Sequence, residues 1–245
     1  MDQLQNYFSA LALFRDDEVA EQKSPQKNKG ATLSKSAATT PAYLKKKGGG
    51  KGKKEGGSED ADVTLMQMPL VWIDLEMSGL DIEKDRILEI ACIVTDGKLE
   101  KIVEGPVIVI SQPEDVLQGM GEWCQEHHAA SGLTDSVRAS TVTEDQAQQE
   151  VLEFLRKHTR GNSGQSMLAG NSIYVDLKFL KKYMPILAAE FSPVLVDVSS
   201  IRALCVRWYP REAEKQPPKK QQHRSLEDIK ESIAELKYLR RSIFK

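Results

Sequence analysis

Cysteine is scarce in this chain of 245 residues: it occurs only as Cys92, Cys124 and Cys205, with no C-x-x-C pair. Three separated cysteines exclude a disulfide framework and a cysteine-rich zinc site. Long apolar runs are absent too, since no segment approaches the roughly 18 residues of a membrane-spanning helix. We therefore expect a protein of a reducing compartment, by default the cytoplasm, with no part inside a membrane.

Excess positive charge is lacking from most of the chain. The net charge is −2, yet residues 22–58 hold ten lysines and a single acid, Glu55, so this stretch is near +9 and the remainder is net acidic. Affinity for a nucleic-acid backbone grows with the number of phosphates neutralised. If nucleic acid is the substrate, the folded part should therefore grip only a short length of it.

Residues 1–62 have the composition of a disordered tail. No apolar residue occurs in the stretch 45–60, so nothing there offsets the entropy lost on ordering. A solvated linker is the plain interpretation, and a nuclear signal or a contact with nucleic acid is the alternative. Leu4, Phe8 and Leu11 have the spacing of a short docking helix. Acids outnumber arginine near the start, which argues against a transit peptide, but the Lys/Ser/Thr/Ala-rich stretch behind them leaves mitochondrial import open.

The composition changes at Pro69, and residues 63–245 are predicted to form one domain. Three strand-like runs come first and suggest an antiparallel meander. Helical sequence follows, including a helix after Thr143, which stands in capping-box spacing to Gln146. Strand and helix then alternate, and a last helix begins at Ser225, its expected N-cap. This order implies an α/β fold with a mixed sheet flanked by helices.

The stretch WIDLEMSGLD places two acids within an apolar strand. Asp74 and Glu76 are two residues apart, so both side chains lie on one face of a strand while Ile73 and Leu75 lie on the other. Burying two carboxylates together is costly unless a positive charge lies between them. Hard oxygen ligands suit Mg²⁺ or Mn²⁺. The alternative is an edge strand with both acids in water.

Two later stretches supply further candidates. Asp176, in AGNSIYVDLKFL, starts a helix after a turn of small residues, and HRSLEDIKESI holds His223 and Asp228 around the start of the last helix. Such a set performs two-metal hydrolysis of a phosphodiester. Asp74 would bridge two divalent cations. Glu76 and Asp228 would hold the cation that activates water, while Asp176 would orient the other. His223 would accept the proton of the water at neutral pH.

Three segments in this order resemble the exonuclease motifs of the DEDDh superfamily: WIDLEMSGLD, GNSIYVDLKFL and HRSLEDIKESIAELKYLR. With RILEIACIVTD, HHAASGL, FLKKYMP and DVSS, the resemblance narrows to the oligoribonucleases and covers about residues 68–245. It implies an RNase H-like fold, a homodimer and Mg²⁺ or Mn²⁺ as cofactor. It also implies trimming of very short RNA, chiefly dinucleotides, from the 3′ end to 5′-mononucleotides.

The resemblance further implies a set of substrate contacts. They are Met77, Leu80, Trp123, His128, Ser172 and Ser199. The first four match positions around the bases and sugar, with Leu80 wedged between two bases, and the serines match small polar residues near the 5′ phosphate. Two of them have plainer alternatives: Trp123 as a core or dimer aromatic, and His128 as a surface pair with His127.

At Ser192, Pro193 and Val194 the chain departs from the family. The family usually carries a His-Tyr-Arg-like tripeptide there, which the partner protomer offers to cap the terminal phosphate of the substrate. Losing a charge-assisted contact of this kind could cost about 1.5–3 kcal/mol, or roughly tenfold to a hundredfold in affinity. The chemistry is expected to be intact, and the preference for dinucleotides is left open. The nearby cations that could compensate are Lys219, Lys220 and Arg224.

Two other functions compete with the dinucleotide-specific one. The first is a DEDDh exonuclease with broader substrates, including short single-stranded DNA. The second is a non-catalytic RNA-binding scaffold, and the presence of all five candidate catalytic residues argues against it.

Overall fold

The computed structural model describes residues 68–159, 166–217 and 224–244. The expected tail, residues 1–62, lies outside them. The strands are β1 (Leu70–Met77), β2 (Ile87–Thr95), β3 (Ile102–Val109), β4 (Met167–Gly170) and β5 (Val196–Asp197). The helices are α2 (Glu114–Gln118), α3 (Glu122–Ala130), α4 (Leu133–Ala139), α5 (Glu144–His158), α6 (Tyr174–Tyr183), α7 (Pro185–Ala188), α8 (Val198–Trp208), α9 (Pro210–Ala213) and α10 (Ser225–Ser242). Within the described residues, no helix combines the length and apolar character needed to cross a membrane.

β1 is the central strand of a five-stranded mixed sheet with the order β3-β2-β1-β4-β5. It pairs antiparallel with β2 and parallel with β4, and β2 pairs antiparallel with β3. The meander and the mixed sheet predicted from the sequence are therefore confirmed. An edge strand with both acids in water is excluded, because β1 has neighbours on both sides.

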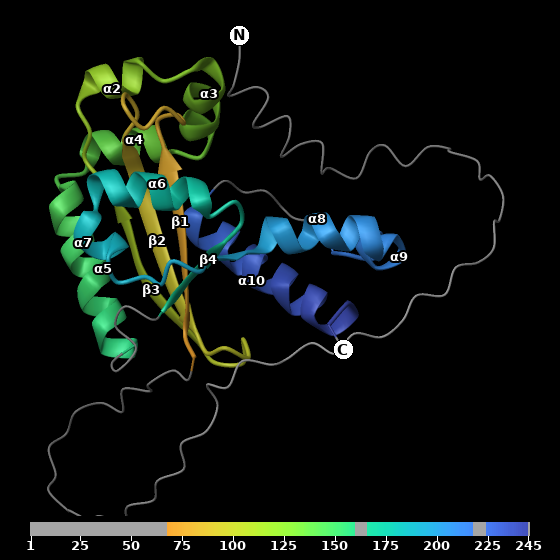
Figure 1. Ribbon diagram of the computed structural model, residues 1–245. Coiled ribbons are helices and arrows are strands. Elements are labelled where there is room, and N and C mark those ends of the chain that lie inside the picture. Colours follow the sequence, from red (N-terminus) through yellow and green to blue (C-terminus); the bar gives the residue numbers. More distant parts are fainter. Residues whose placement is uncertain (1–67, 160–165, 218–223, 245) are drawn as a thin grey trace, which may run out of the picture.

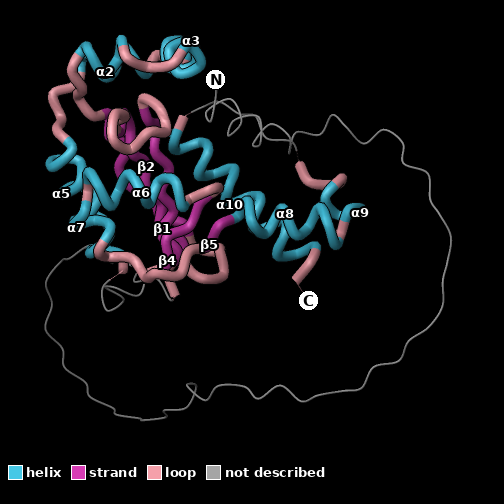
Figure 2. The backbone as a smooth tube through the Cα atoms, turned by 45° about the horizontal axis from the view of Figure 1, so that its top comes forward, coloured by secondary structure: helices cyan, strands magenta, loops and turns pink. Residues whose placement is uncertain are grey.

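Helices cover both faces of this sheet (Figures 1 and 2). On one face, Ile73 and Leu75 of β1 pack with side chains of α5, α6 and α7. On the other face, Trp72 packs with apolar side chains of α8 and α10. Because side chains alternate along a strand, Asp74 and Glu76 share the face of Trp72. The acids thus point toward α10 inside the fold.

Helices α2, α3 and α4 form a separate group at the end of the sheet where β1 finishes (Figure 1). Their buried side chains, including Leu117, Cys124 and Val137, pack against Leu88 of β2. The helical sequence of this region is divided into α3 and α4 at Gly132, whose φ of 74° suits glycine. The group covers the carboxyl end of β1.

Two helix starts differ in how they are capped. At α5 the predicted capping box is confirmed: the N–H of Gln146 donates to the Thr143 hydroxyl at 3.2 Å, and the Thr143 N–H donates to the Gln146 side chain at 2.9 Å. At α10 the prediction of Ser225 as N-cap is wrong. Arg224 holds the N-cap position and Ser225 is the first helical residue. The N–H of Ser225 is bound by a side chain of β2, the carboxylate of Glu89.

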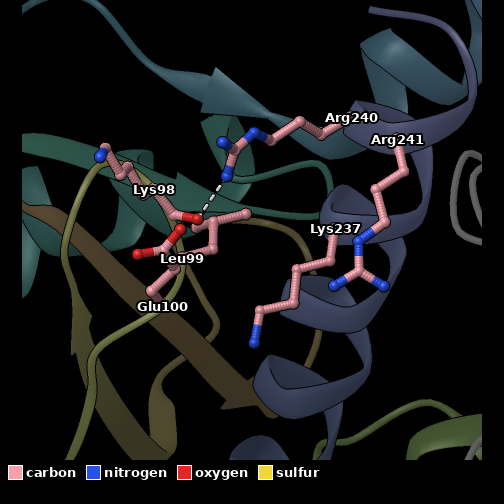
Figure 3. Close-up of a pocket in the computed structure, with 6 residues that line it drawn as sticks. All are labelled: Lys98, Leu99, Glu100, Lys237, Arg240 and Arg241. Carbon is pink, nitrogen blue, oxygen red and sulfur yellow. Dashed lines mark hydrogen bonds between the residues drawn. The ribbon is translucent and has the colours of Figure 1, made fainter.

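A hollow of about 400 Å³ lies at the other end of the sheet (Figure 3). It is lined by Lys98, Leu99, Glu100, Lys237, Arg240 and Arg241. Arg240 donates to the carbonyl oxygen of Lys98, and cations in the last turn of a helix complement its dipole. Since Leu70 pairs with Thr95 at this end of β1, the hollow is separate from the acids at the other end.

Candidate metal centre and substrate site

The carboxylates of Asp74, Glu76 and Asp228 converge on one point. One oxygen atom from each lies within 4.8 Å of the others. β1 supplies the first two, and the first turn of α10 supplies the third. Ile229 and Ile233 hold α10 against the sheet, so the amphipathic pattern of the helix aims Asp228 at β1. These three acids therefore lie together, and their role as metal ligands stays a prediction.

Asp176 joins the group from α6. Its side chain is 6% exposed, and Oδ1 accepts a hydrogen bond from the backbone N–H of Leu75 at 3.0 Å. Leu75 is the residue between Asp74 and Glu76, so this bond fastens α6 to β1 at the acids. Asp176 lies outside the 4.8 Å cluster, but its charge contributes to the raised pKa of Asp74.

This crowding changes the protonation of the acids. Burial raises the pKa of Glu76 to about 8, with the charges of Asp228, Glu89 and Asp176 adding to the effect and the guanidinium of Arg224 opposing it. Burial also raises the pKa of Asp176 to about 7, against the hydrogen bond from Leu75. Burial and then the charge of Asp176 raise the pKa of Asp74 well above its usual range.

The donor set fits a divalent metal. The cluster offers carboxylate oxygens alone, which are the ligands of hard cations. A cation between them would remove the mutual repulsion and bring the pKa values down. The high cost of assembling these acids without a cation makes a metal centre the physical reason for their placement.

A histidine and the end of β1 form one wall beside the acids. His128 is 3% exposed, its Nε2–H donates to the carbonyl oxygen of Met77 at 3.0 Å, and its Nδ1 lies 3.9 Å from a Glu76 oxygen. The alternative of a surface pair with His127 is therefore wrong for His128. Trp123 is 36% exposed and stacks on His127 with ring centroids 3.8 Å apart. Both residues of this aromatic stack belong to α3, the helix that lies near the end of β1 (Figure 1).

The loop after β1 carries the half-buried Leu80 and is held by one carboxylate. Asp85 accepts hydrogen bonds from the Ser78 hydroxyl at 2.9 Å and from the Asp81 N–H at 2.8 Å. Gly79 lies against the same carboxylate, so close that a Cβ there would lie 2.3 Å from Asp85 Oδ2. A residue larger than glycine at position 79 would therefore displace the side chain of Asp85.

The two candidate serines lie together. The hydroxyl oxygens of Ser172 and Ser199 are 3.3 Å apart, although the residues belong to the turn after β4 and to α8. The Ser172 N–H donates to Ser199 Oγ at 3.0 Å and to Asp197 Oδ1 at 3.1 Å, and Ser199 Oγ donates to Asn171 at 3.1 Å. Ser172 has a left-handed φ of 51°, which this network holds. The proximity of the serines is established, and their contact with substrate stays a prediction.

Three further candidates are outside the described residues, so their roles stay predictions: His223, Lys219 and Lys220. Arg224 is described, and its guanidinium is directed at Glu89 and at the Ser131 carbonyl, each at 3.5 Å. Val194, one of the three residues at which the chain departs from the family pattern, is 56% exposed.

Sequence reasoning missed one acid of this region. Glu89 is fully buried on β2 and pairs across the sheet with Glu76. The signal was available: Glu89 is the one charged residue in a nine-residue strand whose every position is buried. A buried acid needs a partner, and the start of α10 supplies partners for Glu89.

The comparisons with known proteins agree with this site. An exonuclease family model, that of RNase T, matches residues 71–236. An oligoribonuclease of Arabidopsis thaliana is 50% identical over 249 residues, which cover 100% of this chain and 99% of that protein. A mitochondrial oligoribonuclease of Homo sapiens is 49% identical over 80% of this chain and 82% of its own length. An oligoribonuclease of Marinobacter nauticus is 51% identical over 72% of this chain and 96% of its own length.

Solved structures share the fold at lower identity. Escherichia coli exonuclease I in complex with a 5cy-dT13 oligonucleotide superimposes with a TM-score of 0.56 at 15% identity, over 73% of this chain and 42% of that one. This likeness shows the RNase H-like exonuclease fold and nothing finer. With the family model and the full-length relatives, it leads to one conclusion: the chain belongs to the oligoribonuclease family of exonucleases.

Proposed function

We propose that this protein is a 3′-to-5′ exoribonuclease that degrades short oligoribonucleotides, chiefly dinucleotides, to 5′-mononucleotides. The observation that carries the proposal is the convergence of Asp74, Glu76 and Asp228 within 4.8 Å on the central strand and α10. Relatives that match the chain over nearly their whole length are named oligoribonucleases.

Four acids would hold the cofactor, two divalent cations, Mg²⁺ or Mn²⁺. Asp74, Glu76 and Asp228 form the converging cluster, and Asp176 is fastened beside it by its bond to Leu75. When bound, the cations would supply Lewis-acid stabilisation of the transition state and lower the pKa of the attacking water. The remaining tasks, accepting the proton and orienting the substrate, belong to the side chains of the protein.

His223 is proposed as the proton acceptor. It directly precedes Arg224, which is described at the start of α10 and lies close enough to Glu76 to lower its pKa. A neutral imidazole can take a proton at neutral pH. His223→Ala should therefore lower kcat far more than it raises KM, and a change in KM alone would contradict the role.

The substrate would lie between the end of β1 and α3. Leu80 is proposed as the wedge between two bases, on the loop that Asp85 holds. Met77, Trp123 and His128 would line the base and sugar, since His128 already contacts the Met77 carbonyl. Ser172 and Ser199 are proposed to contact the 5′ phosphate as a pair.

A digest of four substrates tests the specificity. A dinucleotide, a five-residue RNA, a long RNA and a short single-stranded DNA are incubated with the enzyme and Mn²⁺, with and without chelator, and mononucleotide release is measured. The dinucleotide should be cleaved fastest, and neither the chelated enzyme nor Asp74→Ala should release product. Equal rates on all four would instead favour the broader exonuclease, for which the Ser192, Pro193 and Val194 departure is the specific support. Activity without metal would exclude the proposed chemistry.

Assembly and location complete the proposal. We infer a homodimer, because α8 exposes large apolar side chains, among them Leu204 and Trp208. We infer a cytoplasmic enzyme from the three buried, unpaired cysteines. Mitochondrial import is the competing location, since relatives of Homo sapiens and Bos taurus are named as mitochondrial. Cell fractionation with the full chain decides between them.

A further inference from the structure

Glu89 is a buried carboxylate that the proposed chemistry does not use. It has no exposed surface, and it lies on β2 opposite Glu76, so its side chain shares the face of the acids. A further negative charge makes the crowding there worse. A buried charge is costly unless it is paired and hydrogen-bonded, so the position of Glu89 calls for a reason.

Among the residues that the structure describes, both partners of Glu89 come from the start of α10. Oε1 accepts a hydrogen bond from the Ser225 N–H at 3.3 Å, and Oε2 lies 3.5 Å from the Arg224 guanidinium. The first N–H groups of a helix have no acceptor within the helix, and the N-cap side chain of α10 makes no capping bond. Glu89 thus caps α10 from a neighbouring strand, where the helix dipole also favours a negative charge.

The same contacts determine where Asp228 lies. The N–H of Asp228 donates to the carbonyl oxygen of Arg224 at 3.0 Å, in the first turn of α10. A shift of Arg224 therefore shifts Asp228. Arg224 also reaches the carbonyl oxygen of Ser131 at 3.5 Å, where α3 ends. The contacts of Glu89 and Arg224 join β2, α3 and α10 around the acids.

We propose that Glu89 is a positioning residue, which holds the first turn of α10 through Ser225 and Arg224 so that Asp228 stays in place against Asp74 and Glu76. Its oxygens are engaged with α10, and the cluster within 4.8 Å does not include it. Glu89 is therefore assigned to placing a metal ligand rather than to binding metal. The inference rests on the proposed function of the acid cluster.

The test compares Glu89→Gln with Glu235→Gln in the full-length enzyme. Glu235 is also buried, lies on α10 and pairs with Arg202 at 3.3 Å, but it is two turns from Asp228. Each variant removes the charge of one buried carboxylate that is paired with an arginine, so a purely structural role would lower thermal stability in both and kcat in neither. We expect Glu89→Gln to lower kcat on a dinucleotide about tenfold to a hundredfold at saturating Mn²⁺, with KM within about threefold. Glu235→Gln should keep kcat within about twofold.

Two results would overturn the proposal. One is an equal kcat for the two variants. The other is full recovery of the Glu89→Gln rate when Mn²⁺ is raised, since that behaviour would make Glu89 a metal ligand.

A second variant keeps the test decisive if Glu89→Gln does not fold. Arg224 is exposed, with 45% of its side chain accessible, so Arg224→Met should fold. It should lower kcat about threefold to tenfold, and the double variant should lose little more than Glu89→Gln, because the pair acts as a unit. An unchanged kcat in Arg224→Met, or additive losses in the double variant, would contradict this.

The control for the underlying function is Asp74→Ala in the same assay. If Asp74→Ala is inactive while Glu89→Gln is fully active, only the positioning role fails. If Asp74→Ala is active, the proposed function fails.

Discussion

Asp74 and Glu76 occupy a strand whose two faces are both covered. This placement lowers the stability of the fold unless a cation lies between the two carboxylates. Burial and the neighbouring charges hold the pKa of Asp74 well above its usual range. A carboxyl whose pKa is raised on folding keeps its proton when the unfolded chain has lost it. Stability of the metal-free protein therefore falls as pH rises from the unfolded pKa toward the folded one.

Asp74→Asn is expected to make the metal-free protein more stable and the enzyme less active. Without the carboxyl, the metal-free protein should unfold at a higher temperature at pH 8, with a gain that nearly disappears at about pH 3, where the carboxyl is largely protonated in both states. Activity should fall at least ~10²-fold, as when one group that stabilises a transition state is removed. Thermal unfolding in chelator at the two pH values measures the first effect. A variant that is less stable at pH 8 would show that the carboxylate is not under strain.

Metal affinity should rise with pH in a window that the pKa of Glu76 predicts. That pKa is about 8, and a carboxyl must lose its proton to bind a cation. Between pH 6 and pH 8 the affinity for Mn²⁺ should therefore increase up to about a hundredfold for one proton released. Isothermal titration calorimetry in buffers of different ionisation heat measures the affinity for Mn²⁺ and the number of protons released. Glu76→Gln should make the dependence on pH shallower but not remove it, because the pKa values of Asp74 and Asp176 are raised too. A wild-type affinity that does not change with pH would refute this.

Some residues of the site were readable from sequence and some were not. Asp74 and Glu76 were found because a carboxylate in an apolar strand breaks the pattern, and Asp228 because the helical period aims it at the sheet. Glu89 breaks the pattern of β2 in the same way, but a lone buried acid does not reveal its partner. Its pairing with the start of α10 depends on how far apart the elements lie, and no spacing along the chain encodes that distance.

At the scale of elements, local chemistry decided most outcomes. The strands of the meander follow from their apolar runs, and α5 begins where Thr143 and Gln146 form a capping box. The start of α10 did not follow from its own residues. Ser225 has a good N-cap side chain, yet the carboxylate of Glu89 binds its N–H and the helix begins there. A contact between distant elements thus outweighed the local preference.

Gly79→Ala tests how firmly the loop after β1 is held. An added Cβ would lie 2.3 Å from Asp85 Oδ2, and moving that side chain breaks its bonds to Ser78 and Asp81. The variant should be less stable by about 1–3 kcal/mol, and kcat/KM on a dinucleotide should fall about tenfold because Leu80 shifts. Chemical denaturation and steady-state kinetics measure the two effects.

Gly121→Ala is the matched control for that variant. Its added Cβ would meet no atom within 4 Å, and its φ of −64° suits alanine. It should change stability by less than about 0.5 kcal/mol. Equal behaviour of the two glycine variants would mean that Asp85 adapts and that the loop is not constrained.

At the scale of the whole molecule, the division into a tail, residues 1–62, and a catalytic domain, residues 63–245, stays a prediction. The relative of Marinobacter nauticus is matched over 96% of its length by 72% of this chain, so that oligoribonuclease has no counterpart to a large share of this chain. A fragment of residues 63–245 should therefore keep kcat/KM on a dinucleotide within about twofold of the full chain. A fragment that folds but loses activity would give residues 1–62 a role in catalysis.

The homodimer is a prediction about the surface of α8. Leu204 and Trp208 are 41% and 66% exposed, and because they are four residues apart they share one face of the helix. In Figures 1 and 2, α8 and α9 extend away from the sheet, on the side of α10, so a second copy can reach this face. Trp208→Glu places a charge there and should convert a dimer to a monomer, measured by light scattering after size exclusion.

The control is Ile186→Glu. Ile186 is 50% exposed and belongs to α7, a helix that packs on the opposite face of the sheet. It adds the same charge at a similarly exposed apolar position, so the dimer should persist. Because α8 also carries Ser199, a monomeric Trp208→Glu enzyme that keeps its full kcat/KM would show that each site is complete within one chain. A dimer that survives Trp208→Glu unchanged would instead place the interface elsewhere.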